Sequence, residues 1–370
     1  MDRKKLHQTL SRYIPTWSAV LLALCAASLV LTAAIHRSPA LATALHGTVG
    51  AVIRAVLATL TSWIPFSLAE FLLLGSPMLV GLLTILLLRR TRRSMAEGVR
   101  TTVAILSVVS LFYTLSVFGN EPGFYVDTVD KTVGIEREDL SPEQLYETAV
   151  LLVEDIREDL PAVSYPRGTY SAMTFSYSEL NRKLNAAYDT LCDRYGGFDR
   201  MHTNTKPVML SEPWTYTHIS GMYTFFTGEA NVNVNYPDFI VVSSAAHEMA
   251  HQRGINREDE ANFVAYLVCS LSDDPYIRYC GNVDVLNEVL GQLYSASPEL
   301  YAKVAATVPD EVKRENTAYS QFFEKYRETV VSEVSTAVND AYISSNNQPA
   351  GVKSYGLVVD LVAAYLLQNT

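Results

Sequence analysis

A short motif near the middle of the chain could hold a metal ion. Residues 247–251 read His-Glu-Met-Ala-His, an HExxH pattern with histidines at His247 and His251. On a helix, residues four apart lie on the same face, so both imidazoles can reach one metal ion from one side. Glu248, directly after the first histidine, can act as general base toward a water that zinc activates. The pattern therefore predicts a catalytic zinc site.

A third ligand is expected shortly after this motif. Gly254 is placed to end the motif helix and turn the chain back. Acidic residues then open a second apolar run; we expect Glu258 to be the third ligand, with Glu260 as the alternative. Acidic residues in a first helical turn also complement the helix dipole without any metal. The apolar run before the motif, residues 239–242, predicts a buried strand that leads into the motif helix.

The run HEMAHQRGINREDEANFVAYL, residues 247–267, resembles the signature of a bacterial membrane family catalogued as domain of unknown function 3810. It is also similar, more distantly, to HtpX-like and prenyl-protease-like gluzincins, which pair HExxH with a later ExxxD. Here that second spacing runs from Glu258 to Asn262, with Asn in place of Asp. The resemblance implies a zincin fold, Glu258 as ligand and Asn262 beside the ligands. The closer resemblance covers most of the chain, membrane segments included, and implies no substrate.

Charge divides the chain into two parts. Residues 1–118 hold 11 Lys and Arg against three acids, whereas the remaining residues hold 18 against 36. This asymmetry is typical of a membrane anchor followed by a soluble domain. We therefore expect a membrane region at residues 1–118 and a separate domain at 119–370. No basic patch with interleaved aromatic residues is present, so nucleic acid is not an expected partner.

Three apolar runs predict transmembrane helices at about residues 17–35, 66–88 and 99–118, each long enough for a bilayer core of roughly 30 Å. Residues 41–64, interrupted by Arg54, are expected to lie along the membrane surface or to pack on the bundle. Basic residues precede the first run and separate the second from the third, which predicts cytoplasmic positions for both. The chain is then a multi-pass protein of the cell membrane, with residues 119–370 outside the cytoplasm.

The second part predicts an α+β zincin-like domain, mostly helical with a small sheet. A capping box with Pro142 at the first helical position starts a helix that ends near residue 159, and another spans about 178–194. Short strand-like runs follow at 206–210, 222–226 and 229–234. The last run alternates apolar and Asn residues, so we expect an edge strand that pairs with an extended peptide, an interior strand being the alternative. Its substrate-binding candidates are Ala230, Asn231 and Val232.

Several other residues leave alternatives open. His202 and His218 could complete a ligand set or hold an oxyanion, although lone histidines are usually structural. Cys269 and Cys280 could form one disulfide or remain buried thiols. Residues 283–296, 298–307, 309–344 and 355–367 predict further helices.

These observations predict a membrane-anchored zinc metallopeptidase that acts on peptides or proteins at the outer membrane face, with the lipid bilayer as its other partner. The alternative is a non-catalytic, partner-binding membrane protein with a structural or vestigial metal site. Glu248 favours the enzyme, since a structural zinc needs no general base beside an open position. The sequence encodes no cleavage preference and no oligomeric state.

Overall fold

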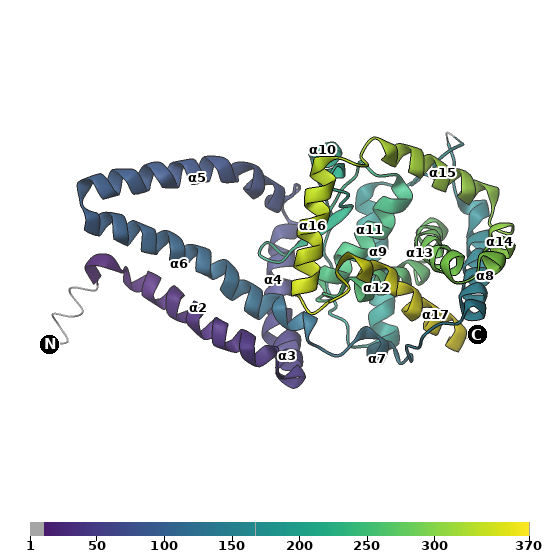
Figure 1. Ribbon diagram of the computed structural model, residues 1–370, viewed down its shortest axis with the longest axis horizontal. Helices are drawn as coiled ribbons and strands as arrows, with labels where there is room; N and C mark the ends of the chain where they lie inside the picture. Colours follow the sequence, from purple (N-terminus) through teal and green to yellow (C-terminus); the bar gives the residue numbers. More distant parts are fainter. Residues whose placement is uncertain (1–10, 167, 370) are drawn as a thin grey trace. The chain divides into compact units, whose positions relative to one another are not determined.

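The computed structural model describes residues 11–166 and 168–369. The chain divides into two compact units (Figure 1). The first comprises residues 1–53, 68–126 and 225–227, and the second comprises 54–67, 127–224 and 228–370. Of the basic residues that precede the first predicted span, Arg3, Lys4 and Lys5 lie outside the described residues.

The first unit is built from long apolar helices. They are α2 (Thr16–Ile35), α5 (Leu68–Arg93) and α6 (Met95–Gly119), and α6 packs against both of the others. The short helices α3 (Pro39–Leu45), η1 (His46–Gly50) and η2 (Glu121–Phe124) also lie in this unit. None of the residues in the most apolar stretch of α5 is buried. A helix that is apolar on every side and unburied is suited to contact lipid.

By length and composition, four helical stretches of the described chain could cross a membrane. Three coincide with the predicted spans, and the fourth is the continuous stretch Pro39–Ser62, formed by α3, η1 and α4 (Ala51–Ser62). From Arg54 onward α4 belongs to the second unit. There Arg54 is 2 % exposed, and its guanidinium lies 2.7 Å from the Asp199 carboxylate. The apolar helices of the chain agree with its association with a membrane.

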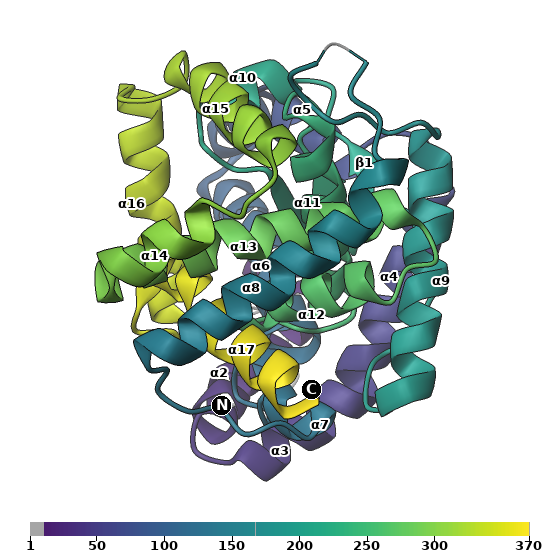
Figure 2. The same cartoon turned by 90° about the vertical axis from the view of Figure 1, so that its right-hand side faces the viewer.

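The second unit is mostly helical. α8 (Pro142–Asp159) lies alongside α13 (Pro275–Ala296), as Figure 2 shows. α8 and α9 (Tyr177–Tyr195) both begin with a complete capping box, and the starts predicted for these two helices agree to within a residue. The remaining helices are α7 (Val129–Val133), η3 (Leu160–Ala162), α10 (Ser211–Thr215), α11 (Asp238–Gln252), α12 (Glu258–Ser270), α14 (Pro298–Ala305), α15 (Asp310–Glu324), α16 (Val330–Ser345), η4 (Gly351–Leu357) and α17 (Val358–Asn369).

Two predicted elements differ in the structure. Residues 239–242 are not a strand but the first turn of α11, which begins at Asp238 after Pro237. Phe239 and Val242 are fully buried there, and burial outweighs the weak strand preference of β-branched residues. The long helix predicted at 309–344 is two helices, α15 and α16, because Glu328 has a left-handed φ of 52° and Thr329 caps a new start.

A three-stranded sheet lies beside α11. Its order is β1 (Lys206–Pro207), β3 (Glu229–Val232), β2 (Gly221–Thr224), with β3 parallel to β1 and antiparallel to β2. The expectation that residues 229–234 form an edge strand is therefore wrong: β3 is central and all four of its residues are buried. The mostly helical α+β class with a small sheet is confirmed. All four cysteines are free, so Cys269 and Cys280 are buried thiols.

Candidate metal centre

The histidines of the motif project from the last turns of α11, and the end of that helix is fixed by its own sequence. Gly254 has φ +91°, its N–H donates to His251 O at 2.9 Å, and Ile255 N–H donates to Ala250 O at 3.1 Å. This pair of bonds is the Schellman C-cap, which favours glycine at the left-handed position. The predicted stop at Gly254 is thus confirmed, and the chain reverses directly into α12.

The same cap orients one imidazole. His251 Nδ1–H donates to the carbonyl oxygen of Ile255 at 2.7 Å, so Nδ1 carries a hydrogen and Nε2, which lies 3.4 Å from Glu258 Oε2, is the nitrogen left for a metal ion. A backbone carbonyl in this role is the usual outer partner of a metal-binding histidine. The His247 ring stands edge-on to the His251 ring, with centroids 4.6 Å apart. Both rings therefore face the same space.

Glu258, the first residue of α12, lies between the two imidazoles. Its Oε2 atom is 3.3 Å from His247 Nε2 and 3.4 Å from His251 Nε2. Four ligands of a tetrahedral zinc ion, at bonds of about 2.0–2.1 Å, lie about 3.3–3.4 Å apart. The three residues form one potential metal-holding group, with their ligand atoms within 4.8 Å of one another. The donor set and its separations fit a zinc ion.

The residues at this site also carry buried polar atoms without partners. His247 Nδ1, Glu248 Oε2 and Glu258 Oε2 are buried and have no hydrogen-bond partner. Burial opposes charge on the imidazole of His251, but the neighbouring Glu258 carboxylate outweighs it and raises the His251 pKa to about 9. Burial would likewise raise the pKa of Glu258, yet the imidazoles hold it well below its usual range. Glu258 therefore stays ionised and favours a positive charge beside it, which a metal ion would also supply.

Glu260, the alternative ligand, points elsewhere. Its Oε1 accepts hydrogen bonds from the Val129 backbone N–H at 3.3 Å and from Arg257 at 3.0 Å. Burial raises the pKa of Glu260 to about 7. Through the bond to Val129, Glu260 ties the start of the longer part of the second unit to α12. Among the described residues, Glu260 is not part of the metal-holding group.

Glu248 occupies a tight pocket between α11 and β2. Glu248 is 4 % exposed. A Cβ added at Gly221 would lie 2.5–2.8 Å from three atoms of the Glu248 side chain. The carboxylate accepts a hydrogen bond from the Tyr223 backbone N–H, while burial raises its pKa to about 6. A carboxylate with such a pKa can take and return a proton near neutral pH. No local pattern marks Gly221 in the sequence, because its role depends on strand pairing.

The other predicted residues lie apart from this group. Asn231 on β3 donates its amide to Met222 O and Thr224 Oγ1, at 3.2 and 3.3 Å, and so bonds to the neighbouring strand. Ala230 and Val232 are fully buried. The residues named as an edge for substrate are therefore interior, and β2 forms an edge of the sheet instead.

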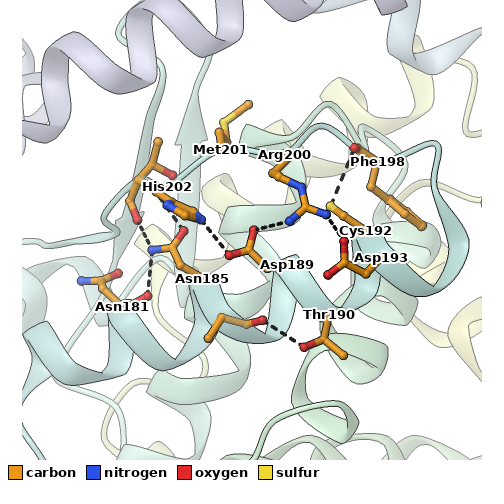
Figure 3. A network of polar contacts seen from close by, with 12 residues as sticks. Asn181, Asn185, Asp189, Thr190, Cys192, Asp193, Phe198, Arg200, Met201 and His202 are labelled. Carbon is orange, nitrogen blue, oxygen red and sulfur yellow. Dashed lines mark hydrogen bonds and ion pairs between the residues drawn. The ribbon is translucent and has the colours of Figure 1, made fainter.

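His202 and His218 make contacts of their own. An imidazole nitrogen of His202 lies 2.8 Å from an Asp189 carboxylate oxygen, in an exposed network that also includes Arg200 (Figure 3). His218 Nε2–H donates to the carbonyl oxygen of Tyr326 at 2.7 Å. These histidines stabilise local structure, as the structural alternative predicted.

The family comparison covers most of the chain. Residues 48–363 match the model of the family described as Protein of unknown function (DUF3810). This range includes all of the residues of the candidate metal centre. No curated protein and no solved structure shows significant similarity to the chain. The matched range, together with the resemblance of residues 247–267, assigns the chain plainly: it belongs to the DUF3810 family.

Proposed function

We propose that this protein is a membrane-anchored zinc metallopeptidase. The observation that carries the proposal is the placement of Glu258 Oε2 at 3.3 and 3.4 Å from the two motif imidazoles, with the buried Glu248 carboxylate next to them in the same helix. His247, His251 and Glu258 would hold the ion. Zinc, when bound, supplies the Lewis acid that activates a water and polarises the scissile carbonyl.

The chain's own residues supply the remaining functions. Glu248 accepts a proton from the attacking water and returns it to the leaving amine, a role suited to its raised pKa of about 6. The Tyr223 N–H and the close approach of Gly221 hold that carboxylate in one position. Among the described residues no further strand pairs with the outer side of β2, so an extended peptide can add there through main-chain groups other than the Tyr223 N–H, which Glu248 uses. Peptides or proteins are therefore the proposed substrates.

The membrane topology is part of the same proposal. A helix that keeps Arg54 buried against Asp199 of the second unit is a poor candidate to cross a bilayer with that residue in lipid. We infer three crossings, which place the second unit outside the cytoplasm under the positive-inside rule. Alkaline phosphatase fused after residue 370 should be active. Inactivity, with a cytoplasmic reporter active instead, would mean that Pro39–Ser62 also crosses.

Metal content of the purified full-length protein tests the proposal first. We expect about one zinc per chain, lost in His251→Ala and Glu258→Gln. Glu260→Gln is the matched control: it removes a neighbouring carboxylate that lies outside the ligand group, so zinc should remain. Absence of zinc from folded wild-type protein, even after zinc is supplied, contradicts the proposal.

Cleavage separates the enzyme from a non-catalytic metalloprotein. Glu248→Gln keeps the side-chain volume and removes the base, so it should retain zinc and lose peptide hydrolysis. A variant that cleaves as fast as the wild type would exclude Glu248 as general base. A wild type that binds zinc and cleaves no peptide in a broad peptide library would favour the partner-binding alternative.

A further inference from the structure

The first residue of α12 receives a contact from a distant part of the chain. Gln348 lies between α16 and η4, and its residue is 6 % exposed. Its Oε1 accepts a hydrogen bond of 2.9 Å from the backbone N–H of Glu258, 90 residues earlier. A buried side chain from another element thus reaches the residue that presents the third donor of the metal-holding group.

This hydrogen bond fills a gap in the capping of α12. The first N–H groups of a helix have no partner within the helix, and a capping side chain usually accepts from one of them. Arg257, at the N-cap position of α12, makes no side-chain capping hydrogen bond. Gln348 accepts the N–H of Glu258 instead, so it fixes the backbone from which the Glu258 carboxylate projects.

The other end of the same amide is unpaired. Gln348 Nε2 is buried and has no hydrogen-bond partner in the described chain. The amide cannot simply be turned over, since its oxygen is needed to accept the Glu258 N–H. Leaving a buried amide donor unsatisfied costs about 1–3 kcal/mol, so such a group in a folded protein calls for an acceptor.

Glu258 Oε2 is likewise buried and has no hydrogen-bond partner. A carboxylate that binds a metal is normally held by hydrogen bonds from residues behind it. We propose that Gln348 is the positioning residue of Glu258, holding its backbone through Oε1 and donating Nε2–H to its carboxylate when the site is loaded. This inference rests on the proposed zinc site. It makes the segment from α16 to η4 part of the metal centre.

Zinc affinity of the full-length protein in detergent tests this inference, measured by competition with a fluorescent zinc chelator. Gln348→Met keeps the length of the side chain and removes both hydrogen bonds, so we expect the Kd for zinc to rise about 10–100-fold, the range for loss of an outer partner. Gln292→Met is the matched control, because Gln292 also bonds to η4, through Gly356 O at 2.7 Å, and has no such bond to Glu258. The control should bind zinc within threefold of the wild type.

A second variant guards against a folding defect. Gln348→Asn keeps an amide but shortens the side chain by one methylene, so it should remain folded and still weaken zinc binding at least tenfold. Wild-type affinity in folded Gln348→Asn or Gln348→Met would overturn the inference, as would an equal loss in Gln292→Met. Failure of the proposed function looks different: the wild type itself would then bind no zinc.

Discussion

The buried ion pair between Lys206 and Glu229 offers a test of what holds the sheet beside the motif helix. Lys206 Nζ lies 2.6 Å from a Glu229 carboxylate oxygen and also donates to Thr61 O at 2.6 Å. The two side chains are 4 % and 0 % exposed, so water cannot replace either partner. Glu229→Gln keeps the volume and an acceptor but removes the negative charge, which leaves a buried ammonium without its counter-charge.

The expected cost follows from this burial. Removing one member of a buried pair costs about 3–5 kcal/mol, whereas replacing both members with apolar residues is often neutral. We expect Glu229→Gln to lower the free energy of unfolding by about 3 kcal/mol, the lower end of this range, because the amide oxygen of the new side chain still accepts from Lys206. For a domain of this size about 1 kcal/mol shifts the melting temperature by about 2–4 °C, so a decrease of about 6–12 °C is expected.

The matched double variant is Lys206→Met with Glu229→Leu. It removes both charges, and Thr61 O still accepts the Ile64 N–H at 2.8 Å. Because no buried charge is left unpaired, the double variant should lose about 1 kcal/mol, less than Glu229→Gln. Thermal unfolding of the full-length protein at one scan rate compares the two. If the melting temperature of the double variant lies below that of Glu229→Gln, the unpaired buried charge does not dominate the loss of stability.

Three further predictions concern the site. Gly221→Ala should lower peptide hydrolysis at least tenfold with zinc content unchanged, because the new methyl group would meet Glu248. Gly291→Ala, where the new methyl group has open space around it, is the control. Equal activity of the two variants would contradict the role given to Gly221. The pKa of Glu248 is raised to about 6, and a base acts only when ionised, so hydrolysis should increase as pH rises through about 6; a flat pH–rate profile from 5 to 7 would refute the assignment. In the folded protein the pKa of Glu260 is raised from 4.5 to about 7, which favours the protonated acid. The stability that this group contributes is therefore lost as the pH rises from about 4.5 to 7. The melting temperature of Glu260→Gln should vary less over that range than that of the wild type.

Local signals explain what the sequence predicted correctly. Ser141 and Ser176 carry complete capping boxes, and Gly254 supplies a left-handed C-cap, so the helix ends could be placed from a few adjacent residues. The HExxH spacing places two imidazoles on one face of a helix whatever surrounds it. A short turn then limits where Glu258 can lie.

Contacts between distant segments explain what the sequence could not predict. Alternation in residues 229–234 is compatible with an edge or a centre, and only the pairing of β1 and β2 decides that β3 is central. Gln348 reaches Glu258 across 90 residues, and no local pattern marks a glutamine for that contact. Choosing between Glu258 and Glu260 likewise required the position of Val129, which accounts for one of the hydrogen bonds to Glu260.

The contacts of Gly228 explain why α4 matters to a site some 190 residues later. Gln252, at the end of α11, donates its amide to Gly228 O at 2.7 Å. Gly228 has φ +70°, and a Cβ there would lie 2.6 Å from the backbone nitrogen of Ala58 in α4. A side chain would therefore clash with α4 as well as strain the backbone. The turn that receives the end of the motif helix is thus packed directly on α4, so a fragment beginning at residue 119 would lack that support. Metal measurements on such a fragment would underestimate the affinity of the full chain.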